Sequence, residues 1–150
     1  MATITSTDLT KRPPRSPRVR LGGYVILPRM LDKGRALLAG TNGEYSYACP
    51  MDQHFLTFTG VDPEGLKKVL AQGKGDGEVL EWIKANAPQK RREEEVIAWS
   101  SYHAKRAPAD LDQKEFFSGL LTQCGPDRHD ISTWFELLDL DDYVSYGGRA

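Results

Sequence analysis

Apolar side chains recur every three or four positions along most of the chain, which is the spacing of amphipathic helices. Strict alternation of apolar and polar residues, which is typical of a strand, never continues long enough to build a sheet. The clearest helical stripe contains Leu27, Leu31 and Leu38, with Pro28 at its start and Gly40 just beyond its end. Proline favours the first turn of a helix and glycine its C-terminal end, so this segment is predicted to be a helix.

Further segments carry helical spacing or capping signals. Ser16 and Pro17 are typical of an N-cap followed by a first helical residue, and they predict a short helix that ends at Gly22-Gly23. The other predicted helices cover residues 52–59, 62–73, 76–87, 93–105, 112–124 and 131–142. We therefore expect an all-α fold, a single-domain helical bundle of about six or seven short helices.

The densest apolar face belongs to the predicted helix over residues 112–124. Phe116, Phe117, Leu120 and Leu121 fall on one side of this helix. We expect all four side chains to be largely buried, so that Leu120→Ala would cost about 2–5 kcal/mol of stability.

The first fifteen residues differ from the rest of the chain, because they are threonine-rich, then basic and proline-rich, with no apolar period. We expect residues 1–15 to form a mobile N-terminal arm and residues 16–150 a single helical domain. A composition of 39% hydrophobic and 27% charged residues is that of an ordinary soluble protein. No apolar run approaches the ~20 residues of a membrane helix, and the N-terminus lacks the apolar segment of a signal peptide. We expect a cytoplasmic protein with no membrane partner.

The formal net charge of −1 conceals a gradient along the chain. Residues 1–40 carry eight basic and two acidic residues, a net of +6, whereas residues 127–150 carry six acidic and two basic residues, a net of −4. We expect carboxylates such as Asp139, Asp141 or Asp142 to approach basic residues of the first 40, within the chain or across a homo-oligomer. The near-zero total argues against a nucleic-acid partner.

Residues of the types used in metal and nucleophile chemistry are dispersed. His54, His103 and His129 do not occur at metal-ligand spacing, so no metal and no other cofactor is expected. The two cysteines lie 75 positions apart, which is typical of free thiols in a reducing compartment. Cys49, Asp52 and His54 lie within six residues and suggest a nucleophile with a base, although a packed thiol is the preferred interpretation.

The strongest candidate site is a basic stretch that begins at Arg18 and is interspersed with tyrosines. Arginine suits carboxylate or phosphate groups, and a tyrosine hydroxyl adds a hydrogen bond. The candidate ligand-binding residues are Arg18, Arg20, Arg29, Lys33, Arg35, Tyr24, Tyr45 and Tyr47. If they form a site, at least two guanidinium groups converge on one cavity that a tyrosine hydroxyl also reaches. The alternative is that these cations are solvated or paired with Asp32 and other acids.

Three segments of the chain carry a family resemblance. The run RSPRVRLGGYVILPRMLDKGRALLAGTNGEY, followed by CPMDQHFLTFTGVD and DGEVLEWI, resembles the bacterial domain-of-unknown-function family 5069. The family-like part covers about residues 8–99, and residues 110–143 look like a helical C-terminal extension. The resemblance implies a small soluble helical protein of bacterial type, and it transfers no activity and no catalytic residues.

Three function hypotheses remain at this point. The leading one is a non-catalytic binding module for a small anionic ligand or an acidic protein segment. The second is a small enzyme that uses the same pocket, with Asp32, Cys49 or His54 as acid–base or nucleophilic groups. The third is a self-associating structural protein whose basic and acidic ends meet between subunits. No catalytic residue is assigned, and the sequence leaves open whether the chain is an enzyme.

Overall fold

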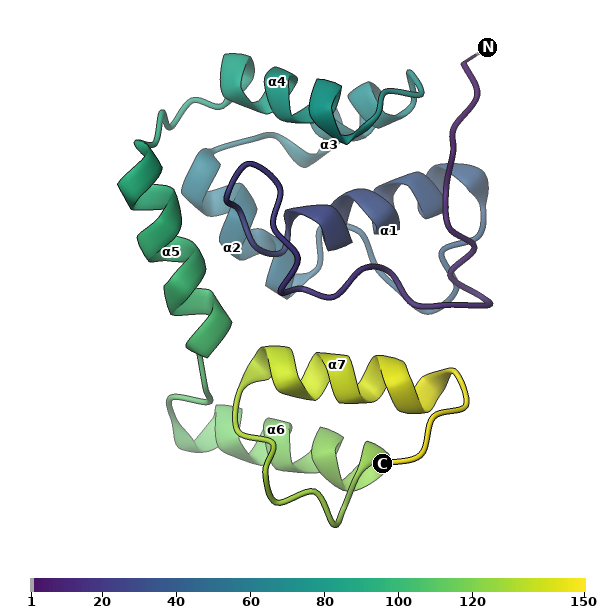
Figure 1. The fold of residues 1–150 in the computed structure, drawn as a ribbon, viewed down its shortest axis with the longest axis vertical. Helices are drawn as coiled ribbons and strands as arrows, with labels where there is room; N and C mark the ends of the chain where they lie inside the picture. Colours follow the sequence, from purple (N-terminus) through teal and green to yellow (C-terminus); the bar gives the residue numbers. More distant parts are fainter. Residues whose placement is uncertain (1) are drawn as a thin grey trace.

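The computed structural model describes residues 2–150, and these form seven helices (Figure 1). The helices are α1 (Leu27–Ala39), α2 (Pro50–Thr59), α3 (Pro63–Leu70), α4 (Asp76–Asn86), α5 (Glu93–Lys105), α6 (Leu111–Cys124) and α7 (Trp134–Ser145). Within the described residues, β-type pairing is limited to one isolated bridge between Leu21 and Tyr24. The predicted all-α fold is confirmed, and each helix predicted from Pro28 onward has a counterpart.

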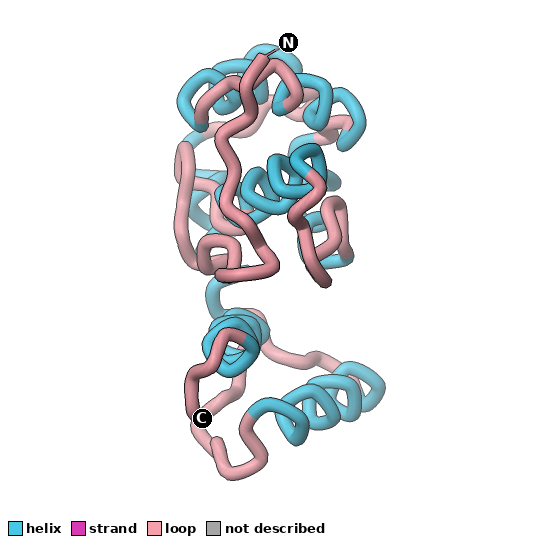
Figure 2. Tube along the Cα trace, turned by 90° about the vertical axis from the view of Figure 1, so that its right-hand side faces the viewer, coloured by secondary structure: helices cyan, strands magenta, loops and turns pink. Residues whose placement is uncertain are grey.

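The helices are arranged in two groups that α5 joins (Figures 1 and 2). In the first group α1 packs against α2 and α3, and α3 packs against α4. In the second group α6 packs against α7, and α5 also contacts α7. None of the helices in residues 2–150 is both long enough and apolar enough to cross a membrane.

Two clusters of buried side chains hold these groups together. The larger cluster fills the space among α1 to α5 and includes Met30, Phe55 and Leu66, all fully buried. The smaller cluster consists of Val25, Ile26 and Phe135. It attaches α7 to the segment before α1, so residues far apart in the sequence share one core.

The short helix predicted after Ser16 is absent. The Ser16 hydroxyl donates to Asp139 Oδ1 at 2.7 Å and accepts from the Arg18 N–H at 3.2 Å, which forms a turn. Gly22 and Gly23 then adopt left-handed φ angles of 59° and 86°. Tertiary contacts with α7 and the glycine pair therefore replace the helix that the local capping signal predicted.

The prediction that α6 carries the densest buried face is wrong. Phe117 is 7% exposed, but Phe116 is 63% and Leu120 is 36% exposed, and Leu121 is only partly buried. The helix packs mainly against α7, at the edge of the molecule (Figure 1). Because only one narrow side of α6 is covered, its apolar residues do not all enter the core.

The segment before α1 is extended and contacts the first helix group. Leu9 is buried, and its N–H donates to the Thr41 carbonyl at 2.9 Å. Arg15 forms ion pairs with Asp32 at 2.9 Å and Asp76 at 2.8 Å. The mobility predicted for residues 1–15 stays a prediction, and these contacts argue against it. Met1 lies outside the described residues.

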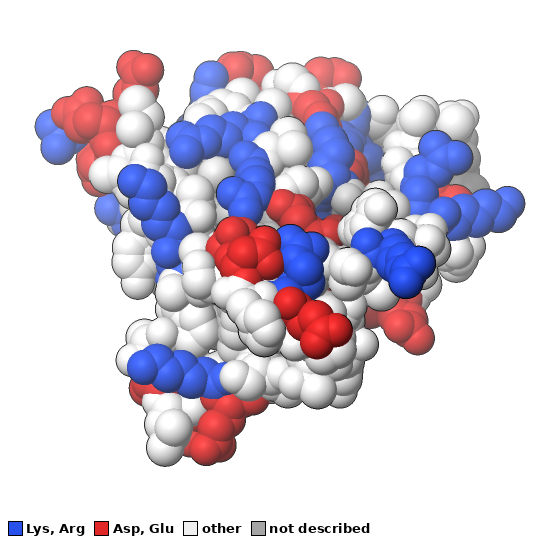
Figure 3. Space-filling model, turned by 60° about the horizontal axis from the view of Figure 1, so that its bottom comes forward, with Lys and Arg blue, Asp and Glu red and all other residues white. Residues whose placement is uncertain are grey.

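The charge gradient along the chain produces contacts within the chain. Arg18 pairs with Asp139 at 2.8 Å and Arg29 pairs with Asp142 at 2.7 Å, so the predicted approach of the acidic end to the basic end is confirmed. On the face that Figure 3 shows, basic and acidic side chains are interspersed.

Candidate functional site

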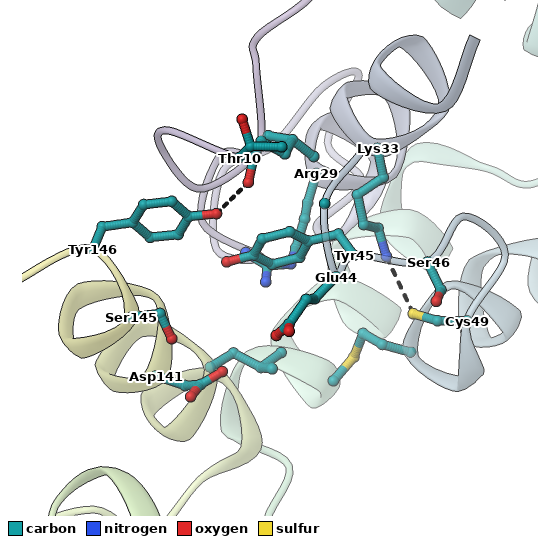
Figure 4. Close-up of a pocket in the computed structure, with 14 residues that line it drawn as sticks. Thr10, Arg29, Lys33, Glu44, Tyr45, Ser46, Cys49, Asp141, Ser145 and Tyr146 are labelled. Carbon is teal, nitrogen blue, oxygen red and sulfur yellow. Dashed lines mark hydrogen bonds between the residues drawn. The ribbon is translucent and has the colours of Figure 1, made fainter. Parts of the chain in front are cut away.

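A cavity of about 650 Å³ lies where the two helix groups meet (Figure 4). Its walls come from the N-terminal segment, α1, the loop over residues 41–49, the start of α2, and α7 with the residues after it. Arg29, Lys33 and Tyr45, three of the residues predicted from the sequence, line this cavity. We call it the central pocket.

The other predicted ligand-binding residues lie elsewhere. Arg18 and Arg20 are on the surface, Tyr24 is buried in the main core, and Arg35 pairs with Asp76. The Tyr47 hydroxyl donates to the Pro63 carbonyl at 2.7 Å. Of the arginines predicted to bind a ligand, Arg29 lines the central pocket and Arg18, Arg20 and Arg35 do not, so the expected convergence of two guanidinium groups is not found there.

Arg29 is held by a buried ion pair with α7. Two of its nitrogens donate to the two carboxylate oxygens of Asp142, at 2.7 and 3.2 Å. The Tyr45 hydroxyl donates to the same carboxylate at 2.8 Å, and burial together with the Asp142 charge raises the Tyr45 pKa. Burial alone would lower the pKa of Arg29, but the hydrogen bonds with Asp142 outweigh it and raise that pKa. The cation on this wall of the pocket is therefore already charge-compensated.

Lys33 lies one helical turn further along α1 and is also paired. Its ammonium is 2.8 Å from Asp52 Oδ2 and donates to Cys49 Sγ at 3.1 Å (Figure 4). Asp52 is fully buried, and its second oxygen, Oδ1, has no hydrogen-bond partner among the described residues. Cys49 lines the pocket as the N-cap residue of α2.

Two further carboxylates that line the pocket have no basic partner in the described part of the chain. Glu44 and Asp141 line it from the loop and from α7, and neither forms an ion pair with any described residue. In Figure 4 both side chains extend into the space between the loop and α7. Burial and the neighbouring Asp142 raise the pKa of Asp141.

The remaining wall is made of hydroxyl and apolar groups. The hydroxyl-bearing residues are Thr10, Ser46, Ser145 and Tyr146, and the main apolar ones are Leu9, Met51 and Leu138. The Tyr146 hydroxyl donates to the Leu9 carbonyl and so connects the residues after α7 to the N-terminal segment. The pocket thus offers fixed cations, accessible carboxylates, hydroxyls and an apolar side.

The sequence patterns did not identify several of these residues as part of a site. Thr10, Asp141 and Tyr146 come from segments separated by more than 100 positions, and no local pattern connects them. The charge gradient was the one signal, since it indicated that the acidic end would meet the basic end.

The other chemical groups considered from the sequence lie away from the pocket. Asp32 pairs with Arg15, and the His54 ring lies beside His103 at a centroid separation of 4.7 Å. Cys49, by contrast, lines the pocket, and both it and Cys124 are free thiols. Within residues 2–150 no three His, Cys, Asp or Glu side chains are grouped so that they could hold a metal ion.

Comparison with known proteins gives a family match. The family model described as a domain of unknown function, DUF5069, matches residues 11–144. The match extends through α6 and α7, beyond the stretch 8–99 that carries the sequence resemblance, so these helices are part of the family's region rather than an extension of it. The comparison with curated proteins found no match.

Proposed function

This chain belongs to the DUF5069 family, and on that premise we propose that it is a binding module whose central pocket takes a small amphoteric molecule. The ligand carries an ammonium group, a carboxylate and an apolar portion. The observation that supports this proposal is the charge arrangement of the pocket, in which the cations are already paired and the accessible carboxylates are not.

The balance of charge argues against a purely anionic ligand. Arg29 and Lys33 are compensated by buried carboxylates, while Glu44 and Asp141 add uncompensated negative charge. A ligand with only negative groups would be repelled by these two carboxylates, whereas an ammonium group would be attracted. The same ammonium would favour the ionised form of Asp141, whose pKa is raised by burial and by the neighbouring Asp142 charge.

The pocket also has hydrogen-bond donors for the carboxylate of the ligand. An ammonium has three N–H groups, and Lys33 uses two of them for Asp52 and Cys49, which leaves one for a ligand carboxylate. The Ser46 hydroxyl lines the same part of the pocket and is a second donor. Leu9, Met51 and Leu138 offer an apolar surface for the body of the ligand.

Three related probes test this proposal by isothermal titration calorimetry and thermal melting. L-Leucine carries both charges, L-leucinamide keeps only the ammonium, and N-acetyl-L-leucine keeps only the carboxylate. We expect leucine to bind most tightly and to raise the melting temperature, because ligand binding stabilises the folded state by about 2.7 kcal/mol at 100 times the Kd. Tighter binding of N-acetyl-leucine would instead support the anionic ligand expected from the sequence, and no binding of any probe would contradict the proposal.

Variants of the two carboxylates sharpen the test. Glu44→Gln and Asp141→Asn should each weaken leucine binding by roughly tenfold, since a hydrogen bond to a charged group contributes about 1.5 kcal/mol. Glu115→Gln is the matched control, because Glu115 is exposed on α6 and does not line the pocket. Equal affinities in all three variants would contradict the assigned orientation of the ligand.

One observation favours the enzyme hypothesis as a second candidate. Cys49 lines the pocket beside Lys33, so the residue best placed for nucleophilic chemistry is Cys49 rather than Asp32 or His54. A cytoplasmic location is also part of the proposal, because a reducing compartment keeps thiols free. The self-association hypothesis loses its main argument, since the terminal charges find partners within the chain.

A further inference from the structure

The surroundings of Cys49 differ from those of an ordinary surface thiol. Cys49 is the N-cap residue of the ten-residue helix α2, and its sulfur accepts a hydrogen bond from the Lys33 ammonium at 3.1 Å. Helix N-termini and neighbouring cations are the surroundings in which reactive cysteines occur. The sulfur also lines the central pocket, so a small molecule in that pocket can reach it (Figure 4).

A buried carboxylate fixes the lysine in this position. The Asp52 Oδ2 atom lies 2.8 Å from Lys33 Nζ and also accepts from the Cys49 backbone N–H at 3.3 Å. Asp52 is fully buried, yet its Oδ1 atom has no hydrogen-bond partner among the described residues. An unpaired oxygen in such a place is costly, because the buried acceptor has lost its hydrogen bonds to water.

We propose that Cys49 is an oxidation site for hydroperoxides, which convert its thiol into a sulfenic acid that Lys33 and Asp52 retain. The sulfur attacks one peroxide oxygen, an S–O bond forms and the O–O bond breaks. With hydrogen peroxide, one thiol and one peroxide give one sulfenic acid and one water. The sulfur is oxidised by two electrons, and the thiol proton leaves in the water.

The same three residues explain why the sulfenic acid would persist. A sulfenic acid adds an oxygen that accepts a hydrogen bond and an O–H group that donates one. The third N–H of Lys33 can donate to the sulfenic oxygen, and Asp52 Oδ1, which has no described partner, can accept from the sulfenic O–H group. No second thiol lines the pocket, so a disulfide does not replace the sulfenic acid there. This proposal does not depend on the amphoteric ligand.

Cys124 is an internal control for this chemistry. It lies near the end of α6, where its sulfur has only a long contact of 4.0 Å with the Leu121 carbonyl. Burial and the nearby Asp141 charge raise the pKa of the Cys124 thiol, which disfavours the reactive thiolate. Both thiols are partly exposed, so a difference in their reactivity reports on their surroundings rather than on access alone.

The experiment treats the full chain with hydrogen peroxide in the presence of dimedone, which traps sulfenic acids, and quantifies both cysteine peptides by mass spectrometry. We expect Cys49 to be trapped at least about tenfold faster than Cys124 in the native protein, and at a similar rate after unfolding in urea. Equal native rates, or faster trapping at Cys124, would overturn the proposal. Cys49→Ala identifies the trapped site, because this variant should lose the fast reaction with dimedone and keep the slow reaction at Cys124.

A double variant tests the role of Lys33 as a positioning residue. Lys33→Met alone leaves Asp52 buried without a counter-ion, so Lys33→Met is combined with Asp52→Asn to keep the site neutral. In this double variant we expect Cys49 trapping to slow by roughly tenfold and Cys124 trapping to stay unchanged, while circular dichroism reports an intact helical fold. An unchanged Cys49 trapping rate in a folded double variant, or an equal slowing at Cys124, would contradict the role of Lys33. If the double variant does not fold, the comparison of Cys49 with Cys124 in the native and unfolded chain decides the proposal.

Discussion

His54 and His103 lie side by side between α2 and α5, and Trp99 lies 4.6 Å from the His103 ring. Burial, then the neighbouring His54 and Arg106, lower the pKa of His103 from 6.5 to about 4. Burial and Arg106 also lower the pKa of His54. The folded protein therefore favours both rings in their neutral form.

Stability is expected to fall in mild acid for this reason. Because the folded pKa of His103 lies below the unfolded value of 6.5, the unfolded state binds protons more readily, and the stabilisation present above pH 6.5 is lost as the pH falls towards about 4. Between pH 7 and pH 5 we expect a loss of about 1 kcal/mol. Urea unfolding at both pH values measures this loss.

His103→Gln is the control for that measurement. Carboxylates also titrate in mild acid, so the quantity that matters is the difference between the two proteins. The variant should lose less stability between pH 7 and pH 5 than the unmodified chain. Parallel losses in the two proteins would show that His103 does not contribute.

Single residues also show the limit of sequence spacing. Cys49 and His54 lie five positions apart, yet α2 directs His54 towards α5 while Cys49 contacts Lys33 of α1. Proximity in sequence indicated a thiol with a histidine base. The fold pairs the thiol with a lysine, which no local pattern indicated.

Among the elements, α6 shows how an apolar pattern overestimates burial. Phe116 and Phe117 are adjacent in sequence, but Phe117 packs edge-on against Trp134 at 5.2 Å while Phe116 remains 63% exposed. Apolar spacing predicts which face of a helix is buried, whereas the width of that face depends on how many neighbours cover it. α6 has α7 as its neighbour on one side, so part of its apolar face stays at the surface.

A pair of substitutions on α6 tests this difference. Phe117→Ala should destabilise the protein by about 3–5 kcal/mol, because it removes a buried ring. Phe116→Ala, which removes the same atoms from the surface, should change stability by about 0.5 kcal/mol or less. Urea denaturation of the two variants measures both values. Similar losses would show that Phe116 is covered in solution, as it would be by a second copy of the chain.

At the scale of the whole molecule, ion pairs connect α7 to the N-terminal part of the chain. Arg29 and Asp142 are almost fully buried, with side chains 5% and 8% exposed, whereas Arg18 and Asp139 are partly exposed at 48% and 35%. Removing one member of a buried pair leaves an uncompensated charge, whereas an exposed pair contributes little. The two pairs therefore differ in what they contribute to the attachment of α7.

Asp142→Ala should cost about 3–5 kcal/mol and should increase amide hydrogen exchange in α7, because Arg29 is left buried without a counter-ion. Asp139→Ala, on the same helix, should cost less than about 1 kcal/mol and leave the exchange pattern unchanged. Chemical denaturation and hydrogen exchange followed by mass spectrometry measure both effects. Equal losses in the two variants would mean that burial of the Arg29 pair does not determine how α7 is held.

Local sequence determined the helices from Pro28 onward, because helical spacing, caps and terminal glycines act over a few residues. It also determined that the two ends would attract, because charge is additive along a segment. The absent helix after Ser16 shows the limit of local signals. Its capping signal is local, but the Ser16 hydroxyl donates to Asp139, 123 positions away.

The central pocket was decided by tertiary structure alone. Its walls come from the N-terminal segment, α1, the loop over 41–49 and α7, and no local signal specifies that these segments meet. The same is true of the cations on α1: the sequence shows that Arg29 and Lys33 are charged, but only the packing of α2 and α7 supplies the carboxylates that compensate them. A charge becomes a ligand-binding group or a structural one according to its partners, and those partners come together only when the chain folds.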